Sequence, residues 1–205
     1  GNIDDYDLVG RHLAEKCNSI VVMVDYRKSP EHKYPVPMQD CYAALNWVDA
    51  NRQKIGADKL PLIVAGDSAG GNLSAVMAQK TVAENGPKID LQVLVYPIID
   101  GRMETESFTA ADNQLFLNAE LMAHFWDSYC PPEKRLNADV SPILADDVSE
   151  IAPAIILAAE FDILVDEGKA YADKLDAAGR LVAYKSFAQQ MHTFFAMPDA
   201  LPVGF

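Results

Sequence analysis

Leu62-Ile63-Val64-Ala65-Gly66-Asp67-Ser68-Ala69-Gly70-Gly71-Asn72 is the stretch of sequence that decides the fold. The run 62–65 is short and apolar, as in a strand buried on both faces, and the small and apolar residues from Ala69 onward suit a helix. Residues 66–70 between them form a G-x-S-x-G pattern. A sharp strand-to-helix turn exposes its central residue in a strained conformation, and flanking glycines let the two backbones pass. We therefore predict a nucleophile elbow with Ser68 at its tip.

Ser68 is predicted to lie at the N-terminus of that helix. There the amide of Ala69 would face the oxyanion that forms when Ser68 attacks a carbonyl group, and the helix dipole would add a favourable field. The pattern alone is weak evidence, because chance gives it in about 7% of chains of this length. A glycine-rich turn that cradles phosphate is the alternative, but no Lys-Ser or Lys-Thr pair follows, as a P-loop requires.

Composition limits the classes of function that remain. With 205 residues, 50% of them hydrophobic, the chain suits one globular domain with a sizeable core. Its formal net charge of -13 disfavours nucleic acids and anionic membranes as partners, since both would be repelled, and favours a small neutral substrate. Whether the chain forms a homo-oligomer stays open.

The three cysteines, Cys17, Cys41 and Cys130, are an odd number at unrelated spacings, so they indicate neither a disulfide framework nor a zinc site. A reducing, cytoplasmic compartment is the natural interpretation. No apolar run reaches 18 residues, so no membrane-spanning segment is predicted. Because the chain does not begin with Met, a signal on a longer N-terminus stays open.

Apolar runs and helical periods alternate along the chain. Buried parallel strands are predicted over residues 19–25, 62–65, 91–96, 154–158 and 182–187. Helices are predicted over residues 4–16, 38–52 and 167–178 and from residue 69 onward. This alternation predicts an α/β fold with a doubly wound, mostly parallel sheet, whose active site lies at the carboxyl ends of the strands.

Residues 101–150 interrupt the alternation and are rich in aromatic side chains. Asn118 is placed to cap a helix that ends at Tyr129. We interpret this segment as a helical insertion, a partial cap before the strand that carries the acid, although ordinary packing of an amphipathic helix explains it equally well. If it is a lid, it helps to confine an acyl group. The candidate substrate-binding residues are Phe116, Trp126 and Leu164.

A serine hydroxyl needs a base to act as a nucleophile, and the base needs an acid to hold its tautomer. In a sheet of this kind the partners follow in the order serine, acid, histidine, each on a loop after a strand. Asp162 follows the strand 154–158 and is the candidate acid. Asp166 and Glu167 lie at the start of the next helix, where capping explains them better.

His192 is the candidate base, because it is the only histidine after the last predicted strand. A lone histidine is by default a structural residue, and the triad order favours the catalytic interpretation here. The other histidines precede the acid and lie on predicted helices or in a turn, so they are assigned no chemistry. They are His12, His32 and His124.

Several motifs together resemble the hormone-sensitive-lipase-like esterases of the α/β-hydrolase fold. The motifs are residues 25–32 (DYRKSPEH), 66–72 (GDSAGGN), Tyr96-Pro97, Ser141-Pro142, 160–168 (EFDILVDEG) and 191–195 (MHTFF). The resemblance implies Ser68 as nucleophile, Asp162 as acid, His192 as base and the Ala69 amide as an oxyanion donor. It further implies a serine carboxylesterase for short- to medium-chain acyl esters that uses neither metal nor organic cofactor.

Two positions depart from the family pattern. Thr193 stands where the family usually has glycine, and Ile163 stands where it usually has proline.

Two other functions also stay open. Some members of the family are receptors that bind a small molecule without hydrolysing it, and these differ at the catalytic histidine, which is present here as His192. An amidase or deacetylase would use the same triad.

Family members also carry a His-Gly-Gly-Gly segment after their third strand, which supplies the remaining oxyanion amides. This chain begins with Gly1-Asn2 and contains no His-Gly-Gly. The resemblance therefore implies a single, N-terminally incomplete domain over residues 1–205, lacking a strand between 20–24 and 62–65. We expect such a fragment to lose about 10²–10³ in kcat and to aggregate or pair those two strands directly.

Overall fold

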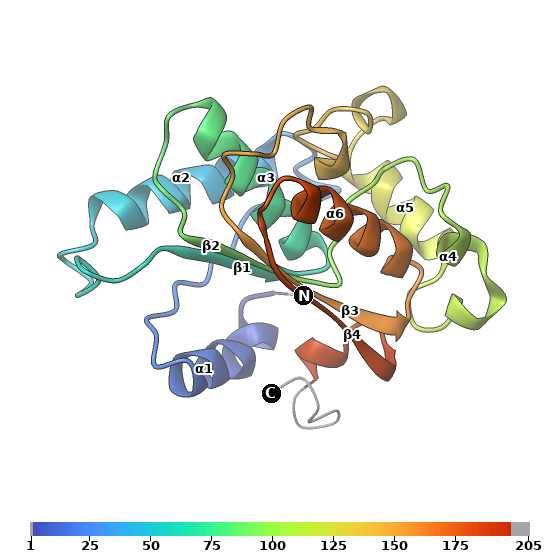
Figure 1. Cartoon of the computed structure of the whole chain (residues 1–205), viewed down its shortest axis with the longest axis horizontal. Helices are drawn as coiled ribbons and strands as arrows, with labels where there is room; N and C mark the ends of the chain where they lie inside the picture. The colour runs from blue at the N-terminus through green and yellow to red at the C-terminus, as the bar shows by residue number, and fades with distance from the viewer. Residues whose placement is uncertain (1, 198–205) are drawn as a thin grey trace.

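A computed structural model describes residues 2–197, so Gly1 and residues 198–205 of the predicted domain lie outside the described residues. Its centre is a parallel sheet with the strand order β1-β2-β3-β4 (Figure 1). The strands are β1 (Ile63–Asp67), β2 (Leu91–Val95), β3 (Ala154–Phe161) and β4 (Leu181–Met191). Every neighbouring pair is parallel, which confirms the predicted α/β class.

Helices cover the sheet unequally. The α-helices are α1 (Asp7–Lys16), α2 (Val36–Ala50), α3 (Ala69–Ala83), α4 (Glu106–Thr109), α5 (Ala119–Tyr129) and α6 (Val165–Ala177). The 3-10 turns are η1 (Asp4–Tyr6), η2 (Ala111–Asn113), η3 (Pro132–Lys134), η4 (Pro142–Leu144) and η5 (Phe194–Ala196). In Figure 1, α2, α3 and α6 lie on one side of the sheet and α1 lies on the other.

Side chains of the central strands alternate between two cores. Leu94 and Ile156 pack with residues of α3 and α6 in the larger core. Their neighbours Val95 and Leu157 point to the opposite face, where they pack against Phe194 of η5. Because successive residues of a strand face opposite sides, both faces of β2 and β3 are covered, and the turn after β4 is held against the sheet.

The strand predicted over residues 19–25 does not form. These residues form no regular secondary structure and pair with no strand in the described sheet, and Ile20, Val22 and Val24 are exposed. Met23 lies against α1 instead, with its sulfur close to Gly10. Apolar β-branched composition gives a segment the capacity to pair, but a strand needs a neighbour to complete its hydrogen bonds. The expected direct pairing of this segment with β1 is also not seen.

The prediction that residues 62–65 are buried on both faces is also wrong. β1 pairs only with β2 and forms an edge of the described sheet, and Ile63 is 48% exposed. At the opposite edge, β4 continues beyond the predicted end at residue 187 as far as Met191. His192 therefore follows its strand immediately, without the short loop expected from the sequence.

The segment 101–150 contains α4, η2, α5, η3 and η4. Asn118 caps α5 as predicted, because its Oδ1 accepts a hydrogen bond of 2.9 Å from the amide of Leu121. The inner face of α5 belongs to a separate buried cluster, which also holds residues 163 and 164 beside the candidate acid. Within residues 2–197, no helix is long and apolar enough to cross a membrane.

Candidate active site

Ser68 lies at the sharp turn between β1 and α3, with φ of 53° and ψ of -116°. A positive φ is strained for a residue with a side chain, as expected for a nucleophile elbow. A Cβ on Gly66 would lie 2.3 Å from the backbone of Gly70, and one on Gly71 would lie 2.8 Å from Pro97. These two glycines therefore allow the close approach of backbones at the turn, whereas Gly70 itself has open space around it.

Three side chains from distant parts of the sequence form one hydrogen-bonded chain. His192 Nε2 lies 3.0 Å from Ser68 Oγ, and His192 Nδ1 lies 2.6 Å from Asp162 Oδ2. Asp162 and His192 are 1% and 4% exposed, respectively. The three residues that the sequence analysis selected are thus brought together in the order and orientation that a nucleophile, a base and an acid require.

Both oxygens of the Asp162 carboxylate have partners. While Oδ2 contacts the imidazole, Oδ1 accepts a hydrogen bond of 3.0 Å from the amide of Leu164. The carbonyl oxygen of Ile163 accepts a 2.9 Å hydrogen bond from Ser107 Oγ, which ties this loop to the segment 101–150. The carboxylate is therefore fixed from both sides, and its orientation in turn fixes the imidazole.

Ala69 is the first residue of α3. The first amides of an α-helix have no partner within the helix, and the helix dipole places partial positive charge there. The backbone of Ser68 is already engaged, because its amide donates to the carbonyl oxygen of Val95 at 2.9 Å and its carbonyl accepts from Asn72. The arrangement leaves the Ala69 amide as a donor beside the hydroxyl that would attack.

The fold agrees with comparisons to known proteins. A family model described as the alpha/beta hydrolase fold matches residues 1–196. The chain belongs to the α/β-hydrolase family. Carboxylesterase NlhH of Mycobacterium tuberculosis is 39% identical to this α/β-hydrolase over 209 residues, covering 100% of this chain and 65% of that protein. This result confirms the resemblance to hormone-sensitive-lipase-like esterases.

Two further relatives give the same result. The arylesterase of Saccharolobus solfataricus is 34% identical, with 97% of this chain and 65% of that protein covered. The structure of a hyperthermophilic esterase from the archaeon Pyrobaculum calidifontis superposes with a TM-score of 0.93 at 39% identity, covering 100% of this chain and 68% of that one. This α/β-hydrolase chain thus spans about two thirds of the length of these relatives.

Two polar residues hold the loop after β2 against the site, and the sequence analysis did not assign either role. Asn72 Nδ2 donates to the carbonyl oxygens of Ile98 and Val140, both at 2.9 Å. Glu167 Oε1 accepts from the amide of Ile99 at 2.7 Å and from that of Asp100 at 3.3 Å. Asn72 within the GDSAGGN motif and Glu167 within EFDILVDEG were the available signals.

Capping is therefore the wrong account of Asp166 and Glu167. Asp166 accepts a hydrogen bond of 2.7 Å from the amide of Ser107, so both carboxylates bind the backbone of the segments that follow β2 and not that of their own helix. Burial raises the pKa of Glu167 well above its ordinary value, and the two amide hydrogen bonds only partly offset this effect.

The three candidate pocket residues differ in burial and in position. Trp126 and Leu164 belong to one buried cluster, together with Ile163 beside the acid. Phe116 is 56% exposed and lies outside that cluster. A pocket wall formed by all three residues at once is therefore not built in this arrangement, but Trp126 and Leu164 share a buried cluster with Ile163, which directly follows Asp162.

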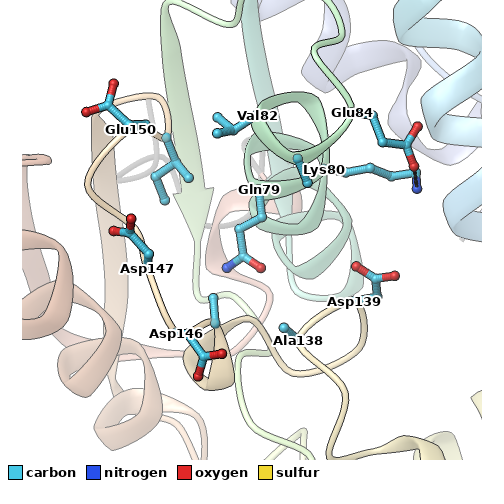
Figure 2. Close-up of a pocket in the computed structure, with 12 residues that line it drawn as sticks. Gln79, Lys80, Val82, Glu84, Ala138, Asp139, Asp146, Asp147 and Glu150 are labelled. Atoms are coloured by element: carbon cyan, nitrogen blue, oxygen red, sulfur yellow. Dashed lines mark hydrogen bonds and ion pairs between the residues drawn. The ribbon is translucent and has the colours of Figure 1, made fainter.

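A surface hollow of about 420 Å³ lies between the C-terminal half of α3 and residues 138–151. Figure 2 shows Lys80 and several labelled carboxylates at this hollow. The labelled carboxylates are Glu84, Asp139, Asp146, Asp147 and Glu150, of which Glu84 forms an ion pair with Lys80. None of the triad residues lines it.

Among residues 2–197, no cluster of histidine, cysteine and carboxylate side chains is arranged to hold a metal ion.

Proposed function

We propose that this protein is a serine carboxylesterase that hydrolyses short- to medium-chain acyl esters through an acyl-enzyme. The observation that carries the proposal is the unbroken chain of hydrogen bonds from Ser68 through His192 to Asp162. Relatives named carboxylesterase, arylesterase and ethyl acetate hydrolase support an ester substrate. The net charge of -13 favours a neutral substrate over an anionic one.

In the first half of the proposed reaction, Ser68 Oγ attacks the ester carbonyl carbon while His192 Nε2 takes the hydroxyl proton. The buried Asp162 carboxylate stabilises the imidazolium that forms. The tetrahedral oxyanion accepts a hydrogen bond from the Ala69 amide at the positive end of α3. When the carbonyl re-forms, the bond to the alkoxy group breaks, and the leaving alcohol takes the proton from His192.

In the second half, a water molecule replaces the alcohol. His192 Nε2 accepts a proton from the water as it attacks the acyl carbon, and the Ala69 amide again faces the oxyanion. Collapse of the second tetrahedral intermediate breaks the bond to Ser68 Oγ, which recovers its proton from His192. The products are a carboxylic acid and an alcohol, and no cofactor is consumed.

The direct test is hydrolysis of p-nitrophenyl esters from acetate to decanoate, together with a fluorophosphonate that labels activated serines. We expect turnover that is highest for short and medium chains and stoichiometric labelling at Ser68. Labelling without turnover of any ester, or of matched p-nitroanilides, would favour a binding protein. Faster cleavage of anilides than of esters would favour an amidase or deacetylase.

The triad assignment predicts strongly non-additive kinetics. Ser68→Ala and His192→Ala should each reduce kcat by about as much as the double variant, because the residues act as a unit. The comparison requires only ester hydrolysis and circular dichroism to confirm that each variant is folded. Labelling that persists in Ser68→Ala would show that another residue is the nucleophile.

A further inference from the structure

Asp67 occupies the position immediately before the candidate nucleophile, at the end of β1. Its Oδ2 accepts a hydrogen bond of 2.9 Å from the hydroxyl of Tyr6 and one of 3.3 Å from the hydroxyl of Tyr96. The donors are 61 and 29 residues away in sequence, on η1 and directly after β2. Two phenols from different segments therefore converge on one carboxylate oxygen beneath the elbow.

Tyr96 connects this carboxylate with the candidate base. Its ring lies against the imidazole of His192, with 4.6 Å between ring centroids, and against Phe194 at 5.4 Å. The residue is buried and has a positive φ of 33°, and its amide donates to the carbonyl oxygen of Leu157. Backbone, ring and hydroxyl are thus each fixed by a different neighbour.

We propose that Asp67 is a positioning residue: by holding the hydroxyl of Tyr96, it keeps that ring against His192 and so keeps the imidazole aligned between Ser68 and Asp162. This inference rests on the proposed esterase function for its kinetic consequences. Asp67 touches neither the substrate nor the reacting atoms in this scheme. It acts on the base through the tyrosine ring, and its negative charge also favours the protonated imidazole that forms during acyl transfer.

The ionisation of Asp67 supports a role beyond stability. Burial raises its pKa, while hydrogen bonds from the two tyrosines and the proximity of His192 act in the opposite direction. A raised carboxyl pKa means that this group's contribution to stability falls as pH rises from its ordinary pKa through the raised value. Ionisation of this buried carboxyl therefore lowers the stability of the fold.

Among residues 2–197, the titratable groups that face Asp67 come from four segments. They are Tyr6 of η1, Tyr26 in the loop before α2, Tyr96 after β2 and His192 after β4. Burial and the nearby carboxylate raise the pKa of Tyr6 and Tyr96, so both phenols stay protonated as donors over the usual working range. The imidazole is the one facing group that changes charge during the proposed reaction.

Asp67→Asn and Tyr96→Phe test the proposal, with Tyr6→Phe as the matched control. Asparagine is neutral and accepts more weakly from the two hydroxyls than a carboxylate does, and phenylalanine keeps the ring but lacks the hydroxyl that anchors it. We expect both variants to reduce kcat about tenfold with little change in KM, and to move the acidic limb of the pH profile. For Asp67→Asn that limb should move to lower pH, since an anion that favours the protonated imidazole is lost. Tyr6→Phe should change kcat by less than about twofold.

The double variant Asp67→Asn/Tyr96→Phe separates positioning from general destabilisation. If Asp67 acts through Tyr96, the double variant should cost about as much in kcat as the more severe single variant. Multiplicative losses, or losses that are equal in Tyr6→Phe and follow the melting temperature, would overturn the proposal. So would an Asp67→Asn variant with the kcat and pH profile of the parent protein.

A readout that needs no ester keeps this test distinct from that of the proposed function. The proton shared between His192 Nδ1 and Asp162 should give a low-field NMR signal in the folded protein. We expect Asp67→Asn and Tyr96→Phe to shift or broaden this signal, while Tyr6→Phe preserves it. An unchanged signal in both variants would contradict the positioning role even if the parent protein hydrolyses no ester. If the parent protein hydrolyses no ester but the signal is perturbed in the variants, only the proposed function is refuted.

Discussion

Thr193, next to the candidate base, has φ of 79° and ψ of -1°. This left-handed conformation is accessible to glycine without strain but costs a β-branched residue about 1–2 kcal/mol. Its hydroxyl Oγ1 is buried and has no hydrogen-bond partner in the part of the chain that the structure describes. Both features identify Thr193 as a strained residue in an otherwise well-connected site.

Thr193→Gly should therefore increase the free energy of unfolding by about 0.5–1 kcal/mol, after the greater flexibility of glycine in the unfolded chain is subtracted. Urea denaturation measures this difference. Thr193→Ala is the control, since it removes the hydroxyl but keeps the strained conformation. If alanine stabilises the protein as much as glycine does, relief of backbone strain is not the cause.

Some residues of the candidate site could be predicted from the sequence, and others could not. Ser68, Asp162 and His192 could be selected because each follows a predicted strand, and parallel strands bring their carboxyl ends to one edge. Asp67 also lies in the motif, but nothing local indicates that hydroxyl groups 61 and 29 residues away meet its carboxylate. Such a network depends on side-chain packing, which strand order does not specify.

Among the elements, α6 helps to link the loop that carries Asp162 to the segment after β2. Its buried Glu167 holds the amides of residues 99 and 100, and the nearby charges of Asp100 and Asp162 add to the effect of burial on its pKa. The folded-state pKa is raised well above 4.5. The stability that this group contributes is therefore fully present below its ordinary pKa and is lost as pH rises toward the folded-state value.

Glu167→Gln should flatten that part of the stability profile, since glutamine can still accept from the amides without ionising. Denaturation midpoints measured between about pH 4 and pH 8 test this expectation. Glu150→Gln, at a largely exposed side chain, serves as the control and should retain the slope of the parent protein. Parallel profiles for the parent and Glu167→Gln would show that the buried carboxyl does not govern the pH dependence.

The second element in question is α5 with its flanking segment. If it forms part of an acyl pocket, kcat/KM should rise with acyl length by about 0.8 kcal/mol per buried methylene and fall once the pocket is full. Trp126→Phe, which frees volume next to residues 163 and 164, should move the optimum to longer chains. Phe116→Ala tests the exposed residue. A profile that neither variant changes would mean that the insertion is only packing.

At the scale of the whole molecule, the sheet has a weakly protected edge. β1 is the outermost described strand on one side, and Ile63 exposes nearly half of its surface there. Unpaired strand edges with apolar side chains are templates for association with another chain. The unpaired, largely exposed segment 20–24 adds a second group of β-branched side chains.

Ile63→Lys should therefore reduce self-association, because a charged side chain on an edge strand opposes pairing with another copy. Size-exclusion chromatography with light scattering over a concentration series measures the effect. Val82→Lys is the control, since Val82 is similarly exposed but lies on α3. Identical mass distributions for the parent and Ile63→Lys would exclude the β1 edge as the association surface.

The exposed segment also shows why part of the fold could not be predicted. Composition over residues 19–25 predicts a buried strand, and composition over residues 154–158 does the same, yet only the latter becomes one. β3 has β2 and β4 on either side, whereas residues 19–25 have no strand beside them among the described residues. Local sequence reports the tendency to pair, while the presence of a partner is a property of the assembled sheet.

The contact between Ser68 and His192 can be used to follow unfolding of the sheet. Ser68 follows β1 and His192 follows β4, the two outer strands of the described sheet, and 124 residues separate them. A fluorophosphonate reacts quickly with the serine only while that contact exists, so its labelling rate reports on the integrity of the complete sheet. Measured along a urea gradient, this rate would distinguish local unfolding at one edge strand of the sheet from cooperative unfolding of the whole domain. No spectroscopic label would have to be added to the protein.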